Sequence, residues 1–268
     1  MKYARIAAIS FLILVGFGCL LADFVAPSSY AHQFRDFPDA PPSRQHLLGT
    51  DDLGRDRFVR VLYGTRVSLL LAPAAALLSS LIAGAIGGTA GFVGGSLEWS
   101  VMAATDLFLS LPWLFLLIAV RALLPLNVSP VTSVTITFAL LGLLGWAASA
   151  RIICADARKL RDSDFILSAR ASGCGGFRLF WRHVVPNLKP LLFVQFWISI
   201  PVFILTETNL GILGLGVTEP LPSWGSLLRE LENFSTLSTH PWQFVPLVLL
   251  ILVVSSLHLV LQQEELPA

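Results

Sequence analysis

The sequence predicts an all-α polytopic membrane protein with about six transmembrane helices. Hydrophobic residues make up 55% of the 268 residues, charged residues make up 13%, and the mean hydropathy is +0.74. This composition is typical of a chain that is mostly surrounded by lipid. Apolar runs long enough to cross the hydrocarbon core of a bilayer recur along the chain, and the largest group of basic residues lies in one polar segment between two of them.

Composition also argues against several other classes of protein. A net charge of +1 is not typical of a nucleic-acid-binding protein. The cysteines Cys19, Cys154 and Cys174 are far apart and lack CxxC spacing, so neither a disulfide framework nor a zinc site is indicated. The sequence has no GxxxxGK[ST] motif, and its five histidines are scattered. We therefore expect no metal site, no cofactor in this chain and no enzymatic activity.

Residues 1–22 are predicted to form the first transmembrane helix. Lys2 and Arg5 precede an apolar run, which also fits a signal peptide or a lipoprotein signal ending at Cys19. The bulky Phe17 and the lack of a clear A-x-A cleavage site favour a retained helix with its N-terminus in the cytoplasm.

Residues 23–66 form a polar segment that we expect on the external side. The segment is rich in proline, and its six arginines are balanced by six aspartates. One preceding helix places it outside, although six arginines count against that placement under the positive-inside rule. It contains the run HLLGTDDLGRD, which considered alone could be a loop with ordinary glycine and aspartate turns.

Residues 67–261 are predicted to hold the other five transmembrane helices, followed by a short tail at 262–268. The glycine pairs 84/88 and 87/91 have the four-residue spacing that lets helix backbones approach closely. Pro201 is expected to break the fifth helix of the chain. The five predicted helices are 67–91, 99–124, 131–153, 188–206 and 244–261.

Asp106 lies within the predicted span 99–124. A carboxylate at the centre of a span costs about 2.5–3.5 kcal/mol on insertion scales, so its side chain should face protein or water. It could serve an ion or substrate site, or it could lie near the cytoplasmic end and bond to a neighbouring helix. Its position within two turns of the start of the run favours the second interpretation.

The polar segment 151–189 holds eight of the 18 basic residues and only three acids, so the positive-inside rule places it in the cytoplasm. Residues 164–171 suit a helix with Asp164 at its positive end. The glycines around Cys174 predict a sharp turn or hinge, and a second helix should then run to Pro186. An exposed helix, a hinge and a second helix suit a segment that a partner outside the bilayer moves.

Residues 207–225 read ETNLGILGLGVTEPLPSWG. Irregular glycine-rich backbone at the end of a span is tolerated only where protein buries it or where it lines a cavity. The segment is therefore either part of an external gate or a structural re-entrant turn.

Three separated runs resemble segments of one family. They are HLLGTDDLGRD, DFILSARASGCGGFRLFWRHVVPN and ETNLGILGLGVTEPLPSWG, and they resemble the membrane (permease) subunits of ABC importers of the oligopeptide/dipeptide/nickel type. The resemblance spans roughly residues 46–225. Leu167 departs from it, because the family has a glutamate there, and Ser168 replaces an alanine. The resemblance implies an ABC type I importer permease fold with cytoplasmic coupling helices.

The resemblance also implies roles for the residues that match its motifs. Contact with the ATPase would fall to Asp164, Phe165, Ala169, Arg170, Gly173, Arg182, His183, Pro186 and Asn187. The external gate, or contact with the binding protein, would involve Glu207, Gly214, Gly216, Ser223, Trp224 and Gly225. The external segment motif consists of Gly49, Thr50, Asp51, Gly54, Arg55 and Asp56.

The implied assembly contains several partners in the bacterial cytoplasmic (inner) membrane, with both termini of this multi-pass chain in the cytoplasm. Two ABC ATPase subunits would use ATP and Mg, and a second permease subunit, most often a different chain, would complete the pathway. An extracytoplasmic solute-binding protein would deliver a peptide-like solute or a nickel chelate.

Two other interpretations remain open from the sequence. An ion-coupled secondary carrier would use Asp106 and Glu207, but no inverted repeats are visible and the basic segment 151–189 would have no role. A degenerate, non-transporting subunit is favoured by Leu167 and by the short tail.

Overall fold

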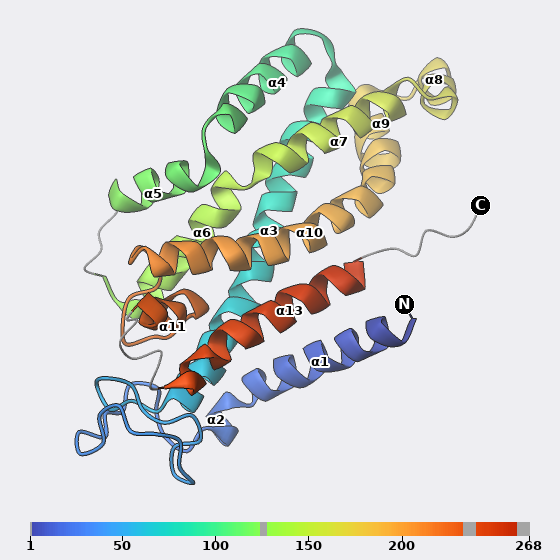
Figure 1. Ribbon diagram of the computed structural model, residues 1–268. Helices are drawn as coiled ribbons and strands as arrows, with labels where there is room; N and C mark the ends of the chain where they lie inside the picture. Colours follow the sequence, from blue (N-terminus) through green and yellow to red (C-terminus); the bar gives the residue numbers. More distant parts are fainter. Residues whose placement is uncertain (1, 124–127, 233–239, 262–268) are drawn as a thin grey trace. The chain divides into compact units, whose positions relative to one another are not determined.

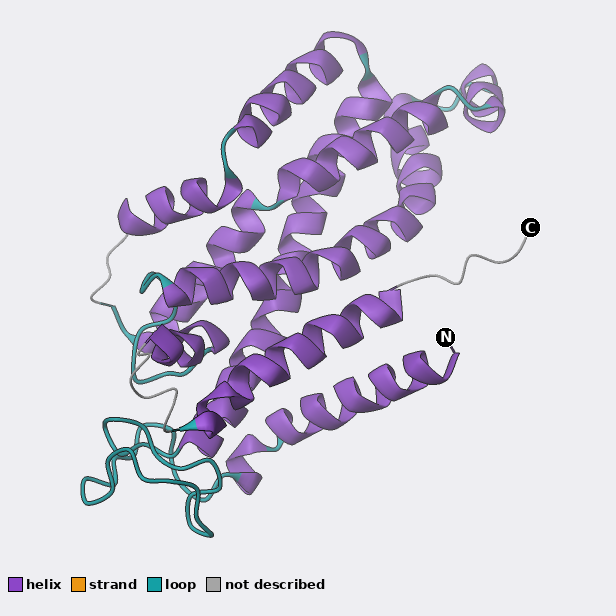
Figure 2. Cartoon of the chain, viewed as in Figure 1, coloured by secondary structure: helices purple, strands orange, loops and turns teal. Residues whose placement is uncertain are grey.

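The computed structural model describes residues 2–123, 128–232 and 240–261 (Figure 1). Its regular elements are helices, and the loop between the second and third helices adds two isolated β-bridges (Figure 2). Five helices are long and apolar enough to cross a membrane, or six when one bent pair counts as a single span. This confirms the predicted all-α polytopic fold.

The chain divides into two compact units. Unit 1 consists of residues 1–72, 121–138 and 201–268, and unit 2 consists of residues 73–120 and 139–200. The division falls within four helices, at Pro73 in α3, between Val120 and Arg121 in α5, between Phe138 and Ala139 in α6, and at Pro201 in α10.

Unit 1 is built on helices from both ends of the chain. The first helix, α1, packs against the last, α13, and the short α11 also contacts α13. The loop between α2 and α3 belongs to this unit. Its elements are α1 (Lys2–Leu20), α2 (Ala22–Val25), the start of α3 (Arg57–Val93), the end of α5 (Trp113–Leu123), part of α6 (Pro130–Leu144), the end of α10 (Val185–Ile212), α11 (Trp224–Arg229), η2 (Glu230–Glu232), η3 (Pro241–Phe244) and α13 (Val245–Leu261).

Unit 2 has a small apolar core that includes Ile153, Ile166, Leu179 and Leu188. A Cβ atom added at Gly87 or Gly91 would lie 2.3 Å from the carbonyl oxygen of Ala150 or Cys154, respectively. These glycines therefore let the backbones of α3 and α7 touch. The elements are the rest of α3, α4 (Gly95–Ser110), most of α5 (Trp113–Leu123), the end of α6, α7 (Trp146–Arg161), α8 (Asp164–Ala171), α9 (Gly176–Leu179), η1 (Phe180–Val184) and the start of α10.

The predicted span 99–124 is not one continuous helix, because α4 and α5 meet at a bend of 85°. Leu111 lies at the bend in extended conformation, with φ −80° and ψ 133°. Its neighbour Pro112 disfavours helical backbone at the preceding residue and itself has no N–H to continue the helix. Residue 124 lies outside the described residues.

Prolines do not end helices at the two other places where the sequence predicted it. Pro186 lies inside a continuous helical stretch from Gly176 to Ile212, and Pro201 lies within α10. The π-helix η1 ends just before Val185 and Pro186. In its wider turn, the N–H of Val185 bonds to the carbonyl of Phe180. This wider turn relieves the contact between a proline ring and the preceding turn.

Other helix ends differ from prediction by several residues. Helix α3 begins at Arg57, where 67 was expected, and α7 continues to Arg161, so the basic segment begins as helix. Both extensions carry charged side chains that pair with acids within their own unit. Helix α13 lies close to the predicted 244–261, and the tail 262–268 lies outside the described residues.

Candidate functional site

Helix α8 carries the first group of predicted coupling residues, and Figure 1 shows it at the turn of the chain between α7 and α9. Ile166 is fully buried in the core of unit 2, and the half-buried Ala169 packs against that core. Asp164, Phe165 and Arg170 are exposed. Leu167 is 48% exposed, so the residue that departs from the family motif lies on the same outward surface. The helix is held from one side and presents mixed polar and apolar groups on the other.

Gly173 forms a defined cap at the end of α8. Its φ of +82° is in the left-handed region, and its N–H bonds to the carbonyl of Arg170 at 3.0 Å. The N–H of Cys174 bonds to the carbonyl of Ala169 at 3.1 Å, which completes a Schellman motif. Cys174 also packs against the core. The predicted glycine hinge is thus a turn that two backbone hydrogen bonds fix.

The second part of the coupling segment runs through α9 and η1 into α10. Arg182, Pro186 and Asn187 are exposed, His183 is half-buried, and the side-chain amide of Asn187 donates to the carbonyl of His183 at 2.6 Å. The buried side of this stretch is formed by Leu179 and Val184. Phe177 is 80% exposed and pairs with Trp181, another exposed aromatic residue.

In unit 1, the run HLLGTDDLGRD folds as a compact turn before α3. Gly49 and Gly54 have φ of +70° and +74°, and a Cβ atom at either would lie 2.3 Å from a backbone carbonyl oxygen. The hydroxyl of Thr50 donates to the carbonyl of Phe37 and accepts from the N–H of Ala40. These contacts explain why the motif needs glycine and threonine at these positions.

Asp56 links this turn to the start of α3. Its Oδ1 accepts from the N–H of Val59 at 3.1 Å, as an N-cap aspartate does. Its Oδ2 lies 2.8 Å from Nδ1 of His46, and both residues are buried. The cap explains why α3 begins at Arg57.

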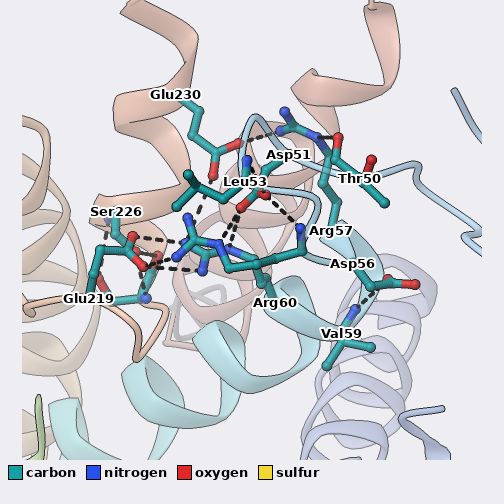
Figure 3. A network of polar contacts seen from close by, with 12 residues as sticks. Thr50, Asp51, Leu53, Asp56, Arg57, Val59, Arg60, Glu219, Ser226 and Glu230 are labelled. Atoms are coloured by element: carbon teal, nitrogen blue, oxygen red, sulfur yellow. Dashed lines mark hydrogen bonds and ion pairs between the residues drawn. The ribbon is translucent and has the colours of Figure 1, made fainter. Parts of the chain in front are cut away.

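The other motif residues join an acid–base network within unit 1 (Figure 3). Asp51 accepts from the backbone N–H and the Nε of Arg55 at 2.7 and 2.6 Å. Arg60 is fully buried, and its NH1 and NH2 donate to the two carboxylate oxygens of Glu219 at 3.2 and 2.9 Å. Four of the six network members, Arg57, Arg60, Glu219 and Glu230, were not predicted from the sequence. The network consists of Asp51, Arg55, Arg57, Arg60, Glu219 and Glu230.

The two glutamates of the network differ in their pKa. Burial opposes ionisation of Glu219, but hydrogen bonds and charges from Arg60 and Arg55 outweigh it and hold its pKa below the ordinary value. Burial holds the pKa of Glu230 above its ordinary value, although Arg57 and Arg60 act in the opposite direction. At Glu219 the arginines therefore outweigh burial and favour the ionised carboxylate, whereas at Glu230 burial prevails.

The predicted gate residues come together around two close contacts among three glycines. A Cβ atom at Gly216 or Gly225 would lie 2.6 or 2.7 Å from the Cα of Gly211, so the end of α10, the following segment and the start of α11 touch through their backbones. Gly214, with φ +75°, ends α10 in a second Schellman motif, since Leu215 bonds back to Leu210. Gly211 was not among the predicted residues.

Polar side chains fix the same region. Ser223 caps α11 in a capping box with Ser226, and the indole N–H of the fully buried Trp224 donates to the hydroxyl of Thr65 at 3.0 Å. Glu207, which was expected after the end of a helix, lies inside α10. It is fully buried, and the hydroxyl of Ser68 lies 3.5 Å from its Oε2.

Asp106 lies on α4 in unit 2, where it forms an ion pair with Arg151 of α7. This agrees with the interpretation that it bonds to a neighbouring helix, although both side chains are more than half exposed. Within residues 2–123, 128–232 and 240–261, no group of three or more histidine, cysteine or acidic side chains is arranged to hold a metal ion.

The comparisons with known proteins agree on one family. Residues 68–263 match the family described as "Binding-protein-dependent transport system inner membrane component". The chain is 35% identical over 206 residues to the oligopeptide transport system permease protein OppC of Bacillus subtilis, an alignment that covers 76% of this chain and 65% of that protein. The chain thus spans slightly less than two thirds of that relative.

Two further relatives are covered more fully. The dipeptide transport system permease protein DppC of Bacillus subtilis is 30% identical, with 88% of this chain and 72% of that protein aligned. The di/tripeptide transport system permease protein DppC of Pseudomonas aeruginosa is 34% identical, with 84% and 74% aligned. The chain therefore belongs to the family of inner-membrane components of binding-protein-dependent transport systems.

Proposed function

We propose that this chain is one permease subunit of an ABC importer. It forms half of the path for a peptide-like or nickel-chelate solute, and a second permease subunit, most often a different chain, forms the other half. Two ATPase subunits supply ATP hydrolysis, and an extracytoplasmic binding protein delivers the solute. The observation that carries the proposal is the family match over residues 68–263, joined to an exposed helix α8 on the segment that resembles a coupling loop.

The geometry of α8 suits a rigid connection between an ATPase and the membrane helices. Its buried face packs against the core that α7, α9 and the start of α10 share, while Asp164, Phe165 and Arg170 remain available to a partner. Force applied to α8 is therefore transmitted to helices that continue into candidate spans. Movement of a packed element as a rigid body is a common way to switch access.

The basic segment 151–189 sets the proposed orientation. Its excess of arginine and lysine favours the cytoplasmic side, where the ATPases lie. The polar segment 23–66 follows one predicted span and so belongs to the external side, and the region around Gly211 acts as the external gate. Peptide is the leading solute class, because the named relatives are oligopeptide, dipeptide and di/tripeptide permeases.

Two neighbouring glycines provide a matched test of the coupling turn. Added Cβ atoms at Gly173 and at Gly175 meet nothing within 4 Å, but only Gly173 has positive φ, whereas Gly175 has φ −64°. Valine at Gly173 is strained by about 1–2 kcal/mol, so the cap of α8 should rearrange. We expect Gly173→Val to abolish solute uptake without loss of protein from the membrane, and Gly175→Val to retain uptake.

Uptake is measured in cells that lack the chromosomal gene and carry each variant, with radiolabelled trialanine and with radioactive nickel plus histidine as probes. Quantitative blotting of membranes controls for the amount of protein. If Gly173→Val takes up a probe that the wild type transports, and does so at the wild-type rate, the proposed role of the turn is ruled out.

A further inference from the structure

Helices α4 and α7 of unit 2 are joined by two groups of ion pairs. Near the start of α4, Glu98 contacts Arg158 and lies 3.6 Å from NH1 of Arg161. Farther along α4, Asp106 contacts Arg151. Since the earlier acid pairs with the later arginines, the two helices are antiparallel.

The two groups differ in exposure. The Glu98 side chain is only 12% exposed, so its contacts with two arginines fasten the start of α4 to the end of α7. Asp106 and Arg151 are 62% and 51% exposed. Ion pairs that are open to water contribute little stability. Asp106 and Arg151 can therefore separate, and each can bind a charged group of another molecule.

The exposed pair lies well inside a helix that belongs to a candidate span. Asp106 is about 16 Å along α4 from Gly95. A charged side chain on a helix of a candidate span faces water or protein, because contact with lipid tails is costly. The exposed acid and base are therefore expected to face a surface that admits polar molecules.

A hollow of about 510 Å³ is lined by Asp106 of this pair and by Arg158, and Arg151 contacts Asp106 from outside the lining. Its volume is in the range of small-molecule sites. Trp99 is 74% exposed, and together with Met102 it offers apolar contact beside the charged groups. The lining residues are Gly95, Glu98, Trp99, Met102, Ala103, Asp106 and Arg158.

We propose that this hollow binds a zwitterion, a molecule that carries both a primary ammonium and an anionic oxygen group. Asp106 receives the ammonium, and Arg151 with Arg158, which is also about half exposed, receives the anionic group. Trp99 and Met102 contact the apolar part between them. A peptide with free ends has this chemistry, and so does the headgroup of phosphatidylethanolamine. For a peptide, the inference deepens the proposed function because it places a solute site on the pathway.

The test is photolabelling of the purified full chain in lipid discs, without ATP or partner subunits. The probe is photoleucyl-alanine, a dipeptide with a diazirine, and its N-acetylated and C-amidated forms are controls. Mass spectrometry locates the label. We expect saturable labelling of the stretch that contains Trp99 and Met102, with both blocked peptides binding about tenfold more weakly than the free one.

Variants assign each charge. Asp106→Asn should remove the preference for the free N-terminus over the acetylated peptide, and Arg151→Gln should remove the preference for the free C-terminus over the amide. The double variant Asp106→Arg, Arg151→Asp keeps an ion pair and should keep the thermal stability of the protein, yet it should not restore the wild-type preferences. Restoration of both preferences by this double variant would mean that the pair only joins the helices.

Lipid composition separates the two sources of the zwitterion. Probe labelling is compared between discs that contain phosphatidylethanolamine and discs of phosphatidylglycerol alone. Weaker labelling in the first discs would show that a lipid headgroup occupies the site. Equal labelling would show that the peptide is the ligand. The proposed site would be contradicted if labelling did not saturate. It would also be contradicted if neither the blocked peptide ends nor the two single substitutions changed the labelling. Because no ATPase is present, a failure of the proposed coupling function leaves this result unaffected.

Discussion

Arg60 and Glu219 lie 159 residues apart in the chain, yet two hydrogen bonds join the guanidinium to the carboxylate. Neither residue was identified from the sequence, because a charged residue in a polar loop does not reveal its distant partner. The glycines that favour close backbone contact were easier to find, since each lies in a recognisable motif. Gly211 is the exception, and only the structure shows that Gly216 and Gly225 both contact it.

The pKa of Glu219 makes the acid–base network sensitive to acid. Because its pKa is below the ordinary value of 4.5, ionised Glu219 stabilises the fold above that pH, and this contribution is lost as the pH falls through the lowered pKa. Glu219→Gln should therefore lower the melting temperature at neutral pH, and the difference from wild type should shrink below pH 4.5.

Melting is followed in detergent from neutral pH to pH 3, with Glu232→Gln, an exposed neighbour, as the control. A difference that is constant across the pH range would show that the network does not depend on the charge of Glu219.

The contact of Gly225 with Gly211 leaves no room for a methyl group. A Cβ atom at Gly225 would also lie 3.0 Å from the carbonyl oxygens of Glu207 and Thr208. We expect Gly225→Ala to destabilise the protein by about 1–3 kcal/mol, as overpacking does. Gly18→Ala, where an added Cβ meets nothing within 4 Å, should have little effect on the melting temperature. Equal melting temperatures for the two variants would contradict this account.

At the scale of the elements, prolines have opposite effects at different places. Pro112 coincides with a sharp bend, whereas α10 continues through Pro186 and Pro201. The sequence predicted the reverse. The effect of a proline depends on the neighbouring turn, such as the π-helix before Pro186, and the proline alone does not show it. Helix α8 was predicted with its observed ends, because an acidic residue and a glycine mark them locally.

Two long helices cross the boundary between the compact units at a proline, α3 at Pro73 and α10 at Pro201. A proline removes one helical hydrogen bond, so bending costs less there. We expect Pro201→Ala to slow amide hydrogen exchange in residues 197–205 in lipid discs. Pro190→Ala, which lies in α10 within unit 2, should leave exchange at 197–205 unchanged. Exchange that Pro201→Ala does not slow would show that this proline adds no flexibility.

For the whole molecule, the motifs of the sequence identified the family, and the family match over residues 68–263 agrees with them. Composition and apolar periodicity were sufficient for a polytopic helical fold. They were not sufficient for the contacts within unit 1 that join residues 50–60 to residues 219–230, since these form only when the chain is folded. The remaining step is the connection to ATPase subunits, for which α8 is the proposed surface.

Affinity purification of the tagged chain from native membranes into lipid discs, with mass spectrometry of its partners, tests this connection most directly. We expect ABC ATPase subunits and a second permease with the wild type. Recovery of the ATPases should be lost in Asp164→Ala, Arg170→Ala and kept in Arg178→Ala, an exposed residue outside α8. Recovery of the wild-type chain without any ATPase, or full recovery of ATPase with the α8 double variant, would contradict the proposal that α8 couples this permease to ATP hydrolysis.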